Sequence, residues 1–134
     1  MVTSIVEYKG NLRTEAIHLE SGTKIITDAP KDNHGNGESF SPTDLMATSL
    51  SSCMLSIMGI VAKRDNIDIV GIKTEVTKIM YSEPRRVGEI HVKLTMPKNN
   101  YSEKERNLLE HAAHTCPVAK SLHPDIIQKI EFIY

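Results

Sequence analysis

Alternating apolar and polar residues predict several β-strands in this chain. The alternation is clearest over 87–96, where Ile90 and Val92 stand between charged or polar residues. Six stretches have the alternation or the composition of strands: 2–8, 12–19, 24–27, 69–81, 87–96 and 129–134. Ser21 and Gly22 predict a hairpin turn between the second and the third, and the stretch 28–39, rich in Gly, Asn and Asp, predicts a loop. Strands are therefore expected both before and after a central helical region.

The longest apolar segment predicts a helix with few solvent-exposed faces. Ser41 and Asp44 have the spacing of a capping box, and Pro42 fits the first helical position. From there to the charged residues at 63–65, apolar side chains occupy every side of the helix. A helix that is apolar all round needs neighbours on most of its faces. We therefore expect a central, buried helix.

A second helix is predicted to begin at Ser102, which has Glu105 in the capping-box position. It should end near Cys116, because Pro117 disfavours helical geometry in the residue before it, and a short helical turn should follow over 117–122. The element order is then βββ-α-ββ-αα-β. We interpret it as one α+β domain over 1–134, with a single, mainly antiparallel sheet wrapped on the central helix.

Charge and composition argue against several classes of function. The net charge of −1 comes without a basic stripe, which argues against a nucleic-acid partner. Five polar residues interrupt the apolar segment 45–62, so we expect neither a signal peptide nor a membrane span. With two cysteines and no export signal, we expect a cytoplasmic protein whose thiols are reduced.

The two cysteines are the candidate chemistry. Cys53 lies midway along the apolar helix, and Cys116 lies 63 positions later, just before Pro117. Two thiols in contrasting settings can form a redox pair. Alternatively, Cys53 is a small core side chain and Cys116 an inert helix cap. The dipole of the following helical turn is expected to lower the pKa of Cys116. Together with His114, Cys116 offers a metal too few ligands, so we expect no metal site.

These residues resemble those of the OsmC/Ohr family, the osmotically inducible and organic hydroperoxide resistance proteins. The resemblance lies in Phe-Ser-Pro-Thr-Asp-Leu at 40–45 leading into the helix with Cys53, and in Cys-Pro-Val at 116–118. It implies an intertwined homodimer that reduces hydroperoxides at the dimer interface without a cofactor. It further implies that peroxide attacks Cys53, that Cys116 closes a disulfide, and that an external dithiol, possibly of lipoyl type, resets the pair.

The resemblance also assigns a role to Arg13, which would polarise the peroxide and favour the thiolate. From the sequence alone, Arg13 can equally be a solvated strand residue, and Arg85 or Arg86 could serve instead. In the best-studied hydroperoxide reductases, a glutamate stands ten residues before the first cysteine. Here Thr43 takes that place and Asp44 follows it.

Asp44 is fully explained as a helix cap. Nine residues of helix would place it about 14 Å along the axis from Cys53. If the start of this helix contributes to a site, it must therefore serve the cysteine of a partner chain. Two functions remain open at this point: a dimeric hydroperoxide reductase, or a non-catalytic OsmC-like module that senses redox state or binds an apolar ligand.

Overall fold

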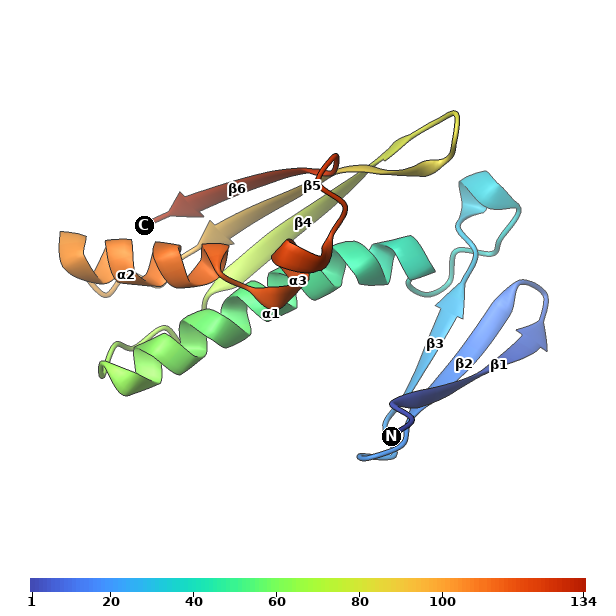
Figure 1. Cartoon of the computed structure of the whole chain (residues 1–134), viewed down its shortest axis with the longest axis horizontal. Coiled ribbons are helices and arrows are strands. Elements are labelled where there is room, and N and C mark those ends of the chain that lie inside the picture. Colours follow the sequence, from blue (N-terminus) through green and yellow to red (C-terminus); the bar gives the residue numbers. More distant parts are fainter. The chain divides into compact units, whose positions relative to one another are not determined.

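The computed structural model describes residues 1–134, which form two compact units, Met1–Leu45 and Met46–Tyr134. The strands and helices follow the predicted order, with an additional single turn of 3-10 helix, η1 (Lys31–Asn33). The α+β class is therefore confirmed. The expectation of a single sheet is wrong, because β1–β3 and β4–β6 form two separate three-stranded sheets (Figure 1).

The first unit is built on an antiparallel meander. Its strands are β1 (Ser4–Gly10), β2 (Arg13–His18) and β3 (Lys24–Asp28). The turn between β1 and β2 is made by Asn11 and Leu12, with φ of 54° and 61°. Two successive residues of positive φ match the twist of a tight hairpin. The resulting register places Arg13, at the start of β2, directly opposite Asp28, at the end of β3.

Helix α1 (Pro42–Arg64) begins as the sequence predicts. The Ser41 N–H donates to Asp44 Oδ2 at 3.0 Å, and the Asp44 N–H donates to Ser41 Oγ at 3.0 Å. This reciprocal pair satisfies two N–H groups at the helix start, so the structural explanation of Asp44 is confirmed.

Along α1, one stripe is buried, formed by Ala47, Leu50, Met54, Met58 and Ala62. Within the single chain the helix is not covered on most faces, as Ile60 on another side is 65% exposed. By length and composition alone α1 could cross a membrane, but the core helix of a soluble protein meets the same criteria.

The second sheet contains one parallel pair that the sequence pattern did not predict. Its strands are β4 (Lys73–Tyr81), β5 (Arg86–Thr95) and β6 (Ile127–Ile133). β4 and β5 are antiparallel, whereas β5 and β6 run parallel. Parallel pairing requires a crossover connection, and the helices between β5 and β6 supply it.

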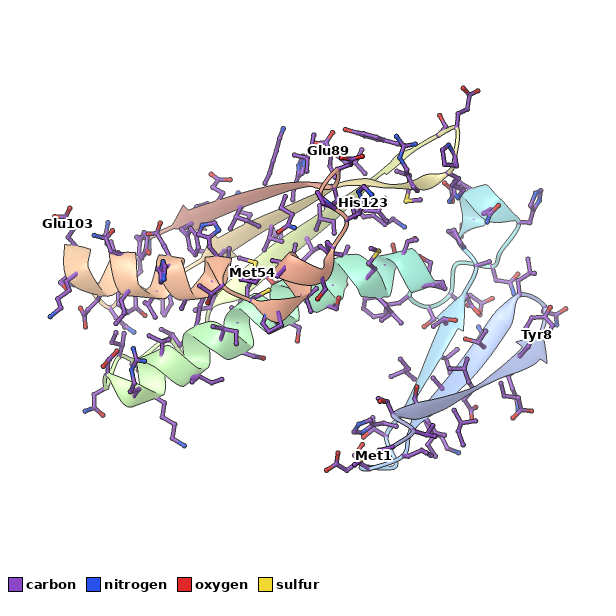
Figure 2. The ribbon with its side chains drawn as sticks, viewed as in Figure 1. Met1, Tyr8, Met54, Glu89, Glu103 and His123 are labelled. Carbon is purple, nitrogen blue, oxygen red and sulfur yellow. The ribbon has the colours of Figure 1, made fainter.

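The core of the second unit lies between this sheet and the helices. Ile90, Val92 and Leu94 of β5 are buried in one cluster with the buried stripe of α1. Figure 1 shows α1, α2 and α3 on the same face of the sheet. Met54 lies between helix and sheet, while Glu89 lies on the opposite face (Figure 2). The alternation predicted along β5 therefore separates core from solvent.

The crossover consists of α2 (Glu103–His114) and α3 (Pro117–Ser121). Ser102 caps α2, with its hydroxyl accepting from the Glu105 N–H at 3.1 Å and the Glu105 carboxylate accepting from the Ser102 N–H at 2.9 Å. Leu109 and Ala113 are the part of α2 that reaches the core. Pro117 then opens α3, so that Cys116 stands at the junction of the two helices.

Replacing Ser102 with Ala should lower the free energy of unfolding by about 1 kcal/mol, because the first turn of α2 loses its cap. Urea denaturation followed by circular dichroism measures the change. Lys104→Ala is the matched control on the same turn, and its exposed side chain should change stability by less than about 0.5 kcal/mol. Equal unfolding midpoints for the two variants would contradict the contribution of the cap.

Candidate active site

The fold brings the two cysteines of the second unit close together. Cys53 is carried by α1 and Cys116 stands before α3, and the Cys53 thiol is near enough to influence the pKa of Cys116. Both are free thiols in this structure. Cys116 is fully buried in the core cluster, whereas Cys53 packs against that cluster and stays partly exposed. Two residues that are 63 positions apart in the sequence thus become neighbours, one partly exposed and one buried.

Cys116 caps α3, as the sequence predicts, but its pKa moves in the opposite direction from the one expected. Its sulfur accepts the Ala119 N–H at 3.3 Å. Burial nevertheless raises the pKa of the Cys116 thiol, and the neighbouring Cys53 raises it further, whereas the helix N–H groups only partly oppose this. A five-residue helix is too short to offset removal from water. Burial therefore favours the protonated form of the Cys116 thiol.

The serines around Cys53 are engaged in helix packing. The hydroxyls of Ser49 and Ser56 donate to carbonyl groups of α1 itself. Ser51 donates to the Thr74 hydroxyl on β4 at 2.7 Å, which ties the helix to the sheet. The hydrogen bonds of these three hydroxyls are accounted for by α1 itself and by β4.

Arg13, the predicted third member of the site, lies in the first unit and is held by a buried carboxylate. Its Nε lies 2.7 Å from Asp28 Oδ1, and its Nη2 lies 2.9 Å from Asp28 Oδ2. Glu38 contributes a longer ion pair, at 3.7 Å from Nη2. Arg13 is thus a strand residue whose side chain is 37% exposed and is also held by an ion pair that the sequence did not predict. The hydrogen bonds from Arg13 also hold the pKa of Asp28 below its usual range, although burial opposes them.

Asp28 is the residue of this region that the sequence analysis missed. In the sequence, Asp28 is the first position of a predicted polar loop. Only the register of β2 and β3 shows that it lies opposite Arg13. The two residues at the start of α1 lie elsewhere. The Asp44 carboxylate accepts the Ser41 N–H, and the Thr43 hydroxyl lies 3.2 Å from the Ser41 hydroxyl.

The outer face of the second sheet carries a hollow of about 480 Å³ whose lining includes neither cysteine. Lys93 on β5 lies 3.8 Å from Glu75 on β4, and His91 Nε2 lies 2.8 Å from Glu89 on the same strand. Opposite charges on facing strands stabilise a sheet, and we assign Lys93 and Glu75 that role. No group of three or more His, Cys, Asp or Glu side chains is arranged to hold a metal ion.

Comparison with known proteins identifies the family. Residues 35–131 match the model of the OsmC-like protein family. This chain belongs to the OsmC/Ohr family. The family is associated with organic hydroperoxide resistance and the stress response. A search of curated proteins found no match.

Solved structures agree with this assignment. A protein of Psychrobacter arcticus 273-4, named for osmotic stress induction and detoxification, is 56% identical, with a TM-score of 0.94 over 98% of this chain and 96% of that one. An organic hydroperoxide resistance protein of Legionella pneumophila has a TM-score of 0.76 at 17% identity, over 100% and 98% of the two chains. One from Elizabethkingia anophelis, with thiocyanate bound, has a TM-score of 0.74 at 18% identity, over 99% and 96%. The last two share the fold with this OsmC/Ohr protein.

The two thiols should differ in reactivity. In the folded protein at pH 8, iodoacetamide should alkylate Cys53 at least about tenfold faster than Cys116, because Cys116 is buried and its pKa is raised. Mass spectrometry of tryptic peptides over time measures both rates. In urea the two rates should become similar. Faster alkylation of Cys116 in the folded protein would contradict the arrangement described here.

Proposed function

We propose that this OsmC/Ohr protein is a thiol-dependent hydroperoxide reductase that uses Cys53 and Cys116. The observation that carries the proposal is that a partly exposed thiol and a buried one are neighbours in the fold. In a family associated with organic hydroperoxide resistance, such a pair matches the need for one attacking and one resolving sulfur. The exposed member, Cys53, is the side chain that a peroxide can reach.

In the first step, the thiolate of Cys53 attacks the distal oxygen of the hydroperoxide. An S–O bond forms and the O–O bond breaks, so that the sulfur is oxidised to a sulfenic acid and the peroxide is reduced to an alcohol. The leaving alkoxide takes up a proton from the surrounding water. Arg13 is proposed to stabilise the negative charge that develops on the leaving oxygen, and to favour the thiolate.

In the second step, the Cys116 sulfur attacks the sulfenic acid of Cys53. A disulfide forms, and the hydroxyl leaves as water with the thiol proton of Cys116. The two cysteines are already neighbours in the fold, which favours this step. An external dithiol, for which we propose the lipoyl type, then reduces the disulfide by two exchange reactions and is itself oxidised. The sulfurs carry both electrons, so the reaction as proposed needs no cofactor. We place it in the cytoplasm, where such dithiols are kept reduced.

One observation favours a second candidate function. Thr43 stands where the best-studied hydroperoxide reductases have a glutamate. Without that carboxylate, the protein could be a non-catalytic module in which the cysteine pair senses redox state or lies beside a bound apolar ligand. The two candidates differ in turnover: a sensor is oxidised once, whereas a reductase consumes peroxide continuously.

With one equivalent of cumene hydroperoxide, the reduced protein should form a Cys53–Cys116 disulfide, because the proposed attacking and resolving thiols are neighbours. With excess dithiothreitol it should consume the peroxide continuously. Mass spectrometry and a peroxide assay measure the two results. Cys53→Ser should abolish consumption, whereas Cys116→Ser should accumulate a sulfenic acid that dimedone traps.

Ser56→Ala is the control for this experiment, since it changes an exposed side chain of α1 and neither thiol. It should consume peroxide at the wild-type rate. Two free thiols after peroxide treatment of the folded wild type would overturn the reductase. A disulfide that forms without continuous consumption would favour the sensor.

We further propose that the protein is a homodimer, as the family resemblance implies. In the single chain, the first sheet leaves Val6, Tyr8 and Ile25 exposed at 60%, 63% and 46%, all on one face by the strand register. A second copy could cover this face and the exposed side of α1. It could also bring the start of α1 towards the Cys53 of the other chain.

Light scattering at low micromolar concentration should therefore give about twice the 15.0 kDa mass of the chain. Val6→Lys should weaken the dimer, because it places a charge within the apolar face. Lys9→Ala, an exposed change on the same strand, is the control and should leave the mass unchanged. A stable folded wild-type monomer at this concentration would rule out the dimer.

A further inference from the structure

We propose that oxidation of the Cys53–Cys116 pair loosens α3, so that residues 117–122 form a redox-sensitive segment of the second unit. The inference rests on the proposed function in one respect, because it requires a disulfide between the two cysteines. It deepens that function by assigning a consequence of the disulfide to a part of the chain that contains neither sulfur. Figure 1 shows this short helix at the crossover between α2 and β6.

The sulfur of Cys116 has a structural task in the reduced protein. Cys116 is the N-cap of α3, and its Sγ accepts the Ala119 N–H at 3.3 Å. Its carbonyl accepts the Lys120 N–H, also at 3.3 Å. Pro117, the first residue of the helix, has no N–H to satisfy. The first turn of α3 therefore depends on Cys116, and in particular on a sulfur that is free to accept the Ala119 N–H.

α3 has little stability of its own. It has five residues, and so short a helix does not persist without support from its surroundings. Gln128 on β6 supplies part of this support, because its Nε2 donates to the Ala119 carbonyl at 3.1 Å. Val118 and Ala119 also pack against the core cluster, but no residue of α3 is fully buried. Loss of the cap therefore affects α3 more than it would affect a longer, buried helix.

A disulfide cannot form without movement of the sulfur atoms. Both cysteines are free in this structure, and non-bonded atoms stay farther apart than two sulfurs in a covalent bond by more than about 1 Å. Cys53 lies within the 23 residues of α1, whose buried stripe fixes that helix in the core. Cys116 instead joins two helices, and the one after it is short. We therefore expect the Cys116 sulfur to make most of the movement and to lose its contact with the Ala119 N–H.

The lost contact also affects access to the disulfide. Cys116 is 0% exposed in the reduced protein, and the first turn of α3 contacts its sulfur through the Ala119 N–H. An external dithiol must reach one of the two sulfurs before exchange can begin. A loosened α3 uncovers the sulfur of Cys116 when there is a disulfide to reduce, and the cap closes over the sulfur again once the thiol is restored.

Hydrogen exchange measured by mass spectrometry tests the loosening. Diamide is used as the oxidant, because it takes two electrons from the two thiols and is itself reduced to a hydrazine, so that no peroxide is needed. In the disulfide form, the backbone amides of residues 118–122 should exchange at least about fivefold faster than in the reduced protein, which is the typical effect of an N-cap on a helix equilibrium. Exchange in α2 is the internal reference and should change less than about twofold. Unchanged or slower exchange in α3 would overturn the inference.

Two variants separate the cap from the oxidation. Cys116→Ser keeps a capping group, because serine is a preferred N-cap residue, whereas Cys116→Ala has none. Without any oxidant, α3 should exchange about fivefold faster in Cys116→Ala than in Cys116→Ser. Neither variant should respond to diamide, since neither can form the disulfide. Equal exchange in the two variants would overturn the role of the sulfur as a cap.

Gln128 allows a test of access to the disulfide. Gln128→Ala removes the hydrogen bond from β6 to α3, so it should raise both the exchange of residues 118–122 in the disulfide form and the rate at which dithiothreitol reduces the disulfide, each about threefold. Lys129→Ala is the matched control. It changes the next residue of β6, which lines the hollow on the outer face of the sheet, and it should alter neither rate. Faster exchange without faster reduction in Gln128→Ala would overturn the role of α3 in access.

The outcomes distinguish the inference from the proposed function. A wild-type protein that consumes no peroxide, but whose α3 loosens when diamide forms the disulfide, overturns the reductase and supports the redox-sensitive segment. Continuous consumption of peroxide with no change in the exchange of α3 overturns the inference alone. A pair of cysteines that diamide cannot join overturns both.

Discussion

Burial of the apolar stripe of α1 with β5 is the interaction on which the second unit depends. Leu50, Met54 and Met58 share one core with Ile90, Val92 and Leu94. The same core takes in α2 and the sulfur of Cys116, so the helix that carries Cys53 is fixed beside the residue that can resolve it. The reactive pair is thus a consequence of hydrophobic packing, because each sulfur is placed by an element whose position the core determines.

The core also makes the two sulfurs chemically different. Cys116 lies inside it, where removal from water raises the pKa of the thiol, while Cys53 lies at its edge and stays partly exposed. Two identical side chains thereby acquire distinct roles in the proposed reaction. The hydrogen bond from the Ala119 N–H to the Cys116 sulfur opposes the effect of burial without reversing it. Burial thus outweighs the short helix in setting the pKa of Cys116.

Burial also matters for Arg13, because its partner Asp28 is a buried carboxylate. The Asp28 carboxylate is almost fully buried, and its charge is compensated by the guanidinium and by the Glu38 N–H. A buried carboxylate without such partners would be strongly destabilising. The pair therefore stabilises the end of the first sheet.

The sequence by itself determined the element order, the capped starts of α1 and α2 and the cap position of Cys116, because these depend on residues three or four positions apart. It also pointed to the family through residues 40–45 and 116–118. Only the tertiary structure decided that the strands form two sheets, that β5 and β6 are parallel, that the two cysteines are neighbours, and that Asp28 partners Arg13. The raised pKa of Cys116 belongs to this second group as well. Strand pairing, burial and contacts between distant residues depend on how the whole chain packs, and no local pattern of residues encodes them.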